Sequence, residues 1–255
     1  MNSTGLQVSN LSISFGGLCA VKDFNLDLPP LSLKGLIGPN GAGKTTAFNL
    51  ITGVYTPDSG TMTLSGKSIT GKAPDQIARA GIIRTFQNIR LFKELSVLDN
   101  VLVAMHMRKP YGFLAGILRT RNFEVKEKEL IEKGQKILEF MGLGNRQHDI
   151  SSSLSYGDQR RLEIARALAT EPTVLLLDEP AAGLNSREKV DLMNKISEIR
   201  HQFQVGILLI DHDMKMIMGI SEHITVLDHG EIIATGTPQQ IQSNPKVIEA
   251  YLGVA

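Results

Sequence analysis

The chain has 255 residues, of which 42% are hydrophobic and 21% charged, and its formal net charge is +1. This length suits one large domain or a core with a subdomain, and the composition is that of an ordinary globular protein. Balanced charge provides no basic surface field, so we expect no nucleic-acid partner. A single cysteine, Cys19, excludes an intramolecular disulfide and a cysteine zinc cluster and suits a reducing compartment.

The N-terminal residues do not predict export. Met1 to Gly5 lack the basic and apolar blocks of a signal peptide, and the longest apolar runs are far shorter than the roughly 18 residues of a spanning helix. We therefore expect a cytoplasmic protein that reaches a membrane only through a partner.

The first thirty residues predict two strands, because apolar side chains occupy mostly alternate positions over Leu6–Phe15 and again over Val21–Leu28. Phe15 ends the first of them beside Gly16. The pattern fits a ring stacked on adenine and a core ring equally well.

The segment from Gly38 to Thr46 reads Gly-Pro-Asn-Gly-Ala-Gly-Lys-Thr-Thr and matches the phosphate-binding loop GxxxxGK[ST]. An apolar strand precedes it, and a helix is expected over Thr45–Thr52, stopped by Gly53. Only a glycine-rich backbone curls tightly enough to point several N–H groups at a triphosphate, and the following helix adds its positive dipole end.

This loop predicts binding of a nucleoside triphosphate. Lys44 would reach the β- and γ-phosphates, and the Thr45 hydroxyl would hold Mg²⁺. The residues expected to contact the nucleotide are Gly38, Pro39, Asn40, Gly41, Ala42, Gly43, Lys44, Thr45 and Thr46.

The next hundred residues change from β to helical character. A turn is expected over Pro57–Gly60, and a strand beginning at Ile82 is expected to end at Gln87. From 91 to about 161, apolar residues recur at helical spacing, and three glutamates each precede a lysine by four positions. The apolar run Tyr111–Leu118 either touches a membrane partner or, as we favour, is buried within this helical region.

Two later strands end in polar residues. Thr173–Asp178 has the composition of a central parallel strand, and Glu179 follows it directly. With a phosphate loop elsewhere in the chain, Asp178 would hold Mg²⁺ and Glu179 would polarise the attacking water. His212 follows the apolar run Val205–Ile210, where it could contact the γ-phosphate. Beyond it, residues 227–234 predict a hairpin, and helices are expected to begin at Thr237 and Pro245.

The sequence Leu154-Ser-Tyr-Gly-Asp-Gln159 resembles the signature motif of ATP-binding cassette (ABC) ATPases, usually Leu-Ser-Gly-Gly-Gln, at the start of a helix. In that family the motif of one subunit meets the nucleotide of a second, so the resemblance implies roles for Ser155 and Gly157 at a partner's ATP. The other family elements follow in order: Phe15 as adenine stacker, Gln87 as sensor of Mg²⁺ and water, Asp178 for Mg²⁺, Glu179 and His212 in catalysis, and 182–185 as the dimer-spanning loop.

The resemblance also implies the fold and its division. We expect an α/β P-loop NTPase core with a mainly parallel sheet, an antiparallel β subdomain and an inserted α-helical subdomain. The core and β subdomain would take 1–90 and 162–240, the helical signature subdomain 91–161, and a C-terminal helix and tail 241–255. Together these would form one ABC transporter domain over about 6–237.

Within the family, the chain resembles the ATP-binding subunit of branched-chain amino acid uptake systems. The resemblance rests on Ser14–Gly17, Arg84–Phe92, Tyr156–Arg166, Glu179–Asn185, Asp211–Met214 and Tyr251–Gly253. It implies ATP and Mg²⁺ as ligands and a position on the inner face of the cell membrane. The implied partners are two permeases, a second ABC ATPase and, indirectly, an extracytoplasmic binding protein.

Three positions depart from the family pattern: Tyr156, Asp158 and Asn185. These departures favour a paralogue over a second copy as the partner ATPase. Related ATPases of urea import or lipopolysaccharide export share much of the pattern and stay as alternatives. A translation cassette would carry two nucleotide-binding sets, whereas only one appears in this sequence. A chromosome ATPase would need a long coiled coil, and the segment from 88 to 153 is too short for one.

Overall fold

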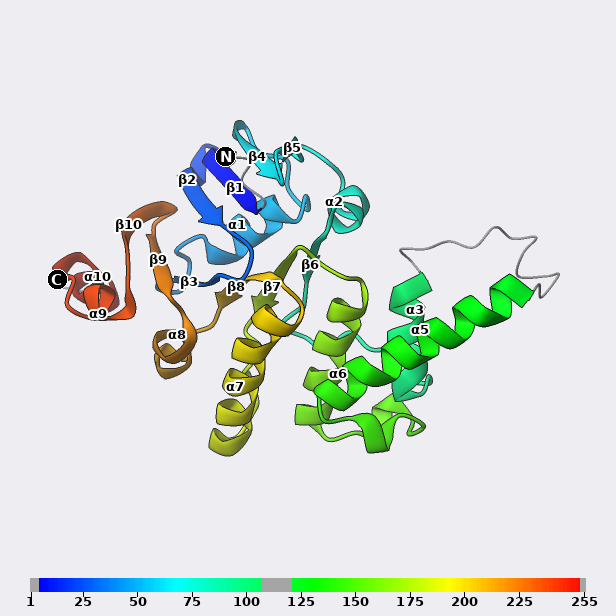
Figure 1. Ribbon diagram of the computed structural model, residues 1–255. Helices are drawn as coiled ribbons and strands as arrows, with labels where there is room; N and C mark the ends of the chain where they lie inside the picture. Colours follow the sequence, from blue (N-terminus) through cyan, green and yellow to red (C-terminus); the bar gives the residue numbers. More distant parts are fainter. Residues whose placement is uncertain (1–4, 107–120, 253–255) are drawn as a thin grey trace.

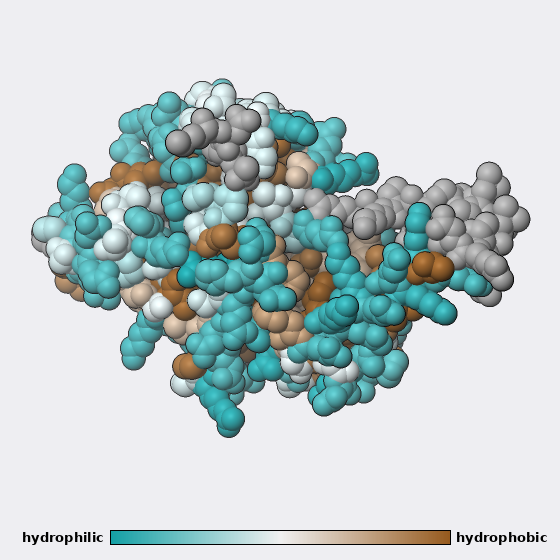
Figure 2. Space-filling view, in the orientation of Figure 1, coloured by the Kyte–Doolittle hydropathy of each residue, from teal (hydrophilic) through white to brown (hydrophobic). Residues whose placement is uncertain are grey.

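The computed structural model describes residues 5–106 and 121–252, so the predicted apolar run Tyr111–Leu118 lies outside the described residues. The chain forms two sheets and a group of helices beside them (Figure 1). On the face shown in Figure 2, most side chains are hydrophilic and the hydrophobic ones gather in small patches. Among the described helices, none is long and apolar enough to cross a bilayer.

The central sheet has six strands in the order β10-β9-β3-β8-β7-β6. Strands β9, β3, β8, β7 and β6 are parallel, and β10 pairs antiparallel with β9. This mainly parallel arrangement confirms the predicted core. The strands are β3 (Leu33–Ile37), β6 (Ile82–Arg84), β7 (Val174–Asp178), β8 (Gly206–Ile210), β9 (His223–Asp228) and β10 (Glu231–Gly236).

The central strands have apolar side chains on both faces, which explains their unbroken hydrophobic runs. In β7, Leu175 and Leu177 enter one hydrophobic cluster, whereas Val174 and Leu176 enter the other. In Figure 1 the antiparallel sheet and helix α1 (Lys44–Ile51) lie on one side of the central sheet, and α7 (Ser186–Gln202) and α8 (Met214–Ile220) on the other.

The second sheet is antiparallel, in the order β2-β1-β4-β5. Its strands are β1 (Leu6–Phe15), β2 (Leu18–Leu28), β4 (Ser59–Leu64) and β5 (Lys67–Ser68). The expected turn at Pro57–Gly60 was wrong at its end, because β4 already begins at Ser59. Gly60 lies against β1 so closely that an added Cβ would be 2.4 Å from the Asn10 carbonyl oxygen.

Three helices form a unit at one side of the sheets: α3 (Val97–His106), α5 (Arg121–Phe140) and α6 (Tyr156–Ala169) (Figure 1). Short 3₁₀ turns at Gly144–Arg146 and Ser151–Ser153 connect α5 to α6. The inserted helical region is thus confirmed. The expected boundary between 161 and 162 falls inside α6, and the division into subdomains stays a prediction.

The remaining helices are α2 (Pro74–Ala80), α9 (Pro238–Gln242) and α10 (Pro245–Leu252). Thr237 caps α9 in a capping box, as predicted, and α10 begins at Pro245, as predicted. The expected boundary at 240/241 falls inside α9.

The strand expected to reach Gln87 ends earlier, at Arg84. The amide of Thr85 still donates to Leu176 O of the neighbouring strand at 2.9 Å. Beyond this point, backbone groups from Phe86 to Arg90 bond instead to side chains of α6. Gln87 is therefore a loop residue.

Candidate nucleotide-binding site

The phosphate loop joins the end of β3 to α1 and packs against neighbouring backbone at only some of its residues. An added Cβ at Gly38 would lie 2.0 Å from Leu227 O, and one at Gly43, where φ is +98°, would lie 2.6 Å from Ala20 O. At Gly41, where φ is +82°, an added Cβ would meet nothing within 4 Å. The loop thus presses on neighbouring backbone at two glycines and opens to free space at the third, a shape that lets a phosphate approach its N–H groups.

Lys44 lies inside this curve. Its Nζ donates to Gly38 O at 2.7 Å and to Pro39 O at 2.8 Å. Burial lowers the pKa of Lys44, and the charge of Glu179 acts in the opposite direction. Both bonds are to carbonyls of the loop itself, so the ammonium is held where an incoming phosphate would meet it.

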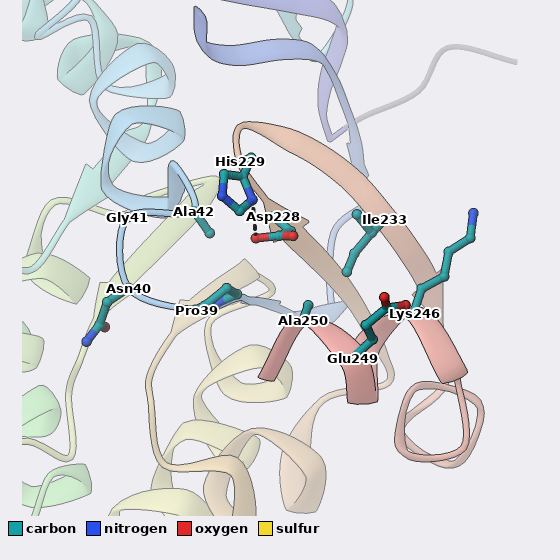
Figure 3. Close-up of a pocket in the computed structure, with 10 residues that line it drawn as sticks. All are labelled: Pro39, Asn40, Gly41, Ala42, Asp228, His229, Ile233, Lys246, Glu249 and Ala250. Carbon is teal, nitrogen blue, oxygen red and sulfur yellow. Dashed lines mark ion pairs between the residues drawn. The ribbon is translucent and has the colours of Figure 1, made fainter. Parts of the chain in front are cut away.

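Two cavities border the loop. The smaller one, of about 290 Å³, opens at the start of α1 and is lined by Leu18, Cys19, Ala20, Gly41, Ala42, Gly43, Lys44, Thr45, Thr46, His229 and Gly230. The larger one, of about 720 Å³, lies between the loop and α10 (Figure 3) and is lined by Pro39, Asn40, Gly41, Ala42, Asp228, His229, Ile233, Lys246, Glu249 and Ala250.

His229 lines both cavities, although the sequence indicated only a hairpin there. Figure 3 shows its ring beside Ala42 and paired with Asp228, with Nδ1 2.9 Å from Oδ1. His229 and Gly230 both have positive φ, as a tight hairpin turn between β9 and β10 requires. The amide of Gly230 also donates to Ala42 O at 3.1 Å, which ties the hairpin to the loop.

Glu179 follows β7 and collects two of the other predicted catalytic residues. Gln87 Nε2 donates to Glu179 Oε2 at 2.7 Å, and His212 Nδ1 lies 3.6 Å from the same oxygen. The Glu179 amide donates to Ile210 O at 2.8 Å. Three segments far apart in sequence thus meet at one carboxylate, as the predicted roles require, while the roles themselves stay predictions.

Asp178 forms an ion pair that the sequence did not indicate. Its Oδ2 accepts from Arg84 Nη2 at 2.6 Å, and both side chains are about nine-tenths buried. Arg84 Nη1 also donates to Asn49 at 2.7 Å, and the guanidinium lies 5.4 Å from the ring centroids of Phe48 and Phe86. The only sequence signal was a basic residue at the end of an apolar strand.

Phe15 is not a core side chain. It is 45% exposed, and its ring packs edge-on against Tyr55 with centroids 5.1 Å apart. Of the two interpretations, adenine stacking is the one that an exposed ring allows, and it stays a prediction.

The signature segment, residues 154–159, begins α6 in the helical unit and not at the phosphate loop. Ser155 is the N-cap of α6 and accepts from the Asp158 amide at 3.2 Å. Gly157 lies close to Glu188, whose Oε1 would be 2.9 Å from an added Cβ. Glu188 in turn closes the capping box of Asn185 at the start of α7.

A family model described as "ABC transporter" matches residues 21–182 of the chain. The "High-affinity branched-chain amino acid transport ATP-binding protein LivG" of Escherichia coli K12 is 49% identical over 255 residues and is covered in full, as is this chain. The chain belongs to the ABC transporter family. A second model, "Branched-chain amino acid ATP-binding cassette transporter", matches residues 231–255 of this ABC cassette.

Other relatives of the cassette agree. The protein named BraF from Pseudomonas aeruginosa is 49% identical over 98% of each chain. A crystal structure of an ATP-binding cassette of an ABC transporter in its ADP conformation has a TM-score of 0.84, with 33% identity over 98% of each chain. These likenesses confirm the predicted fold and identify the chain as an ABC-type ATPase.

Proposed function

We propose that this chain binds and hydrolyses ATP to drive uptake of branched-chain amino acids through partner permeases. The observation that carries the proposal is the full-length 49% identity to LivG, whose name states this transport. The match of residues 231–255 to the branched-chain amino acid model supports it independently of the nucleotide motifs.

The phosphate loop and Lys44 would bind the phosphates of ATP, and Phe15 would stack on the adenine. Thr45, Gln87 and Asp178 would hold Mg²⁺, which neutralises phosphate charge when bound. In the described part of the chain, no group of three or more His, Cys, Asp or Glu side chains is placed to hold a metal ion by itself. Mg²⁺ fits a smaller set, because it takes oxygen ligands and is commonly held by one or two carboxylates together with substrate phosphates and water.

Glu179 would orient the attacking water and accept its proton. Gln87 donates its hydrogen bond to Glu179 Oε2, and His212 lies close to the same oxygen. These two contacts fix the direction of the other carboxylate oxygen of Glu179. Ser155 and Gly157 of this chain would complete the nucleotide site of a second ABC ATPase, which would do the same in return. Catalysis then rests on positioning and electrostatics.

The proposed assembly contains two permeases and two ATPases, with an extracytoplasmic binding protein supplying the amino acid. It would hold this chain in the cytoplasm at the inner face of the cell membrane. Tyr156 and Asp158 favour a paralogue as the second ATPase.

The test is purification of the tagged chain from native membranes in mild detergent, followed by reconstitution of the recovered complex in vesicles with ATP inside and the extracytoplasmic binding protein outside. We expect two permeases, a second ATPase and ATP-dependent uptake of labelled leucine. The control is the Glu179→Gln complex, which should bind the same partners without driving uptake. Uptake of urea but not leucine, or recovery with an export-type membrane pair, would overturn the proposed substrate.

A further inference from the structure

Residues 86–92, between β6 and α3, have no regular structure, and α6 provides partners for their backbone. Arg160 donates from Nη1 to Phe86 O and from Nη2 to Gln87 O, each at 2.7 Å. Glu163 Oε1 accepts from the amides of Phe86 at 3.4 Å and Arg90 at 3.3 Å. Arg166 donates to Arg90 O. The spacing of three places Arg160, Glu163 and Arg166 on one face of α6, so successive turns of the helix form hydrogen bonds to successive parts of the loop.

Two of these side chains, Arg160 and Glu163, are in the interior. Arg160 is completely buried and Glu163 is 6% exposed, and their ion pair measures 2.6 Å. Burial raises the pKa of Glu163, and the charge of Arg160 acts against this shift. A buried ion pair stabilises little beyond an apolar pair of the same volume, but losing one partner leaves a buried charge. What it gives here is directed bonds to backbone groups that no strand or helix satisfies.

At one end, these hydrogen bonds reach the candidate catalytic residues around Glu179. Arg160 holds the carbonyl of Gln87, while the side chain of Gln87 donates to Glu179 Oε2 at 2.7 Å. One residue thus lies between the buried guanidinium and the candidate catalytic carboxylate.

The other end reaches the signature segment through Tyr156. Its hydroxyl lies 3.4 Å from Arg160 Nη2. Its ring covers Gly183, where an added Cβ would lie 2.9 Å from the ring and φ is +77°. A single side chain therefore contacts both Arg160 and the segment that follows Glu179.

We propose that Arg160, Glu163 and Arg166, called here the α6 ladder, are positioning residues that place Gln87 against Glu179, and that Tyr156 links the ladder to the signature segment. This inference rests on the proposed function. The signature segment serves the partner's nucleotide, whereas Gln87 serves this chain's own, so the ladder couples the two ATP sites.

The first test compares Arg160→Lys with Arg161→Lys in the assembled complex. Lysine keeps the charge beside Glu163 but cannot reach two carbonyls as a guanidinium does. Arg161 is the matched control, because its partly exposed side chain lies 3.7 Å from Asp158 and outside the ladder. We expect Arg160→Lys to lower kcat about tenfold with a KM for ATP within about twofold, as misplacement near the chemistry does.

Acting through Gln87 has a signature that general destabilisation lacks. In a Gln87→Ala background, Arg160→Lys should reduce kcat no further, because the residue it positions is gone. Multiplicative loss in the double variant would overturn the proposal.

The second test needs no turnover and no transported substrate, so it separates this inference from the proposed function. Hydrogen exchange of the peptide covering 86–92 in the full chain should be about tenfold faster in Arg160→Lys, because losing the bonds to the carbonyls of Phe86 and Gln87 favours local opening, which exposes the loop amides. Arg161→Lys should match the wild type. If Arg160→Lys does not fold, Arg166→Lys is measured in its place. Exchange unchanged in the measured ladder variant would overturn the proposal.

Tyr156→Phe tests the link alone. It keeps the ring on Gly183 and removes the hydroxyl, so exchange of 86–92 should stay near wild type while the Hill coefficient for ATP hydrolysis falls towards one. A wild-type Hill coefficient would remove Tyr156 from the proposal.

Discussion

The side chain of Gln87 donates a 2.7 Å hydrogen bond to Glu179, and the backbone of Glu179 is left-handed, with φ of +47°. For a residue with a Cβ this conformation costs about 1–2 kcal/mol. The surrounding strands enforce it, because the Glu179 amide is bonded to Ile210 O in β8. Glu179 is thus fixed both at its backbone amide and at its carboxylate oxygen Oε2.

Replacing Glu179 by glutamine should abolish most hydrolysis without loss of ATP binding. The amide keeps the shape and the contact with Gln87 but cannot accept a proton, so we expect turnover to fall by ~10²–10⁴. Single-turnover hydrolysis in the assembled complex and calorimetric ATP affinity measure the two effects.

The control for this change is Glu198→Gln. Glu198 is 55% exposed and pairs with Lys195 at 2.7 Å, a surface ion pair that contributes little. It should hydrolyse ATP at the wild-type rate, and a Glu179→Gln complex that does the same would exclude Glu179 as the base.

Alanine substitutions at two glycines can distinguish the effect of backbone strain on stability from the effect of the phosphate loop on ATP binding. Gly41 and Gly71 both have positive φ, +82° and +67°, and at neither would an added Cβ meet an atom within 4 Å. Alanine at either position should therefore destabilise the fold by about 1 kcal/mol.

Only Gly41→Ala should also weaken ATP binding, by at least about tenfold, because its methyl points into the space where the phosphates are proposed to lie. Urea denaturation and calorimetry on the two variants decide this. Equal ATP affinity in both would place the phosphates elsewhere.

Much of the fold followed from local patterns. Strands β1, β2, β7 and β8 could be predicted because their apolar residues alternate or form continuous runs. Helix α1 could be predicted from the phosphate-loop motif, which ends at Thr45. The hairpin around His229 was predicted for the same reason, since its turn chemistry is local.

What the sequence did not reveal depends on distant partners. β6 ends at Arg84 because α6, and not β7, satisfies the backbone from Phe86 onward. The ion pair of Arg84 with Asp178 and the burial of Arg160 arise from residues far apart in the chain. A charged residue on a helix, such as Arg160, indicates an exposed face by default, and only the packed structure shows that it lies inside.

Arg84→Met should strongly destabilise the chain. It leaves Asp178 as a buried charge without its arginine, and removal of one partner of a buried pair costs about 3–5 kcal/mol. The matched control is Arg79→Met, whose exposed pair with Asp75 measures 3.8 Å and should contribute less than about 0.5 kcal/mol. Urea denaturation measures both. Equal losses would contradict the burial of the Arg84 pair.

The last prediction concerns acid stability at the segment that carries His212. Asp213 caps α8 by accepting from the Met216 amide, and its Oδ2 lies 2.7 Å from Lys189 Nζ. The hydrogen bond from Lys189 lowers the pKa of Asp213 below its ordinary value of 3.8. A carboxyl group with a lowered pKa in the folded chain stabilises the fold above its unfolded pKa and loses this effect as the pH falls through its folded pKa.

Asp213→Asn keeps the cap but not the ion pair, so it should be less stable than wild type by about 0.5 kcal/mol at pH 7. That difference should shrink below about pH 3.8 and disappear once Asp213 is protonated in the folded chain. Urea denaturation of both chains from pH 7 to pH 3 measures it, with Lys189→Met expected to behave as Asp213→Asn does. A difference that grows as the pH falls would contradict the lowered pKa.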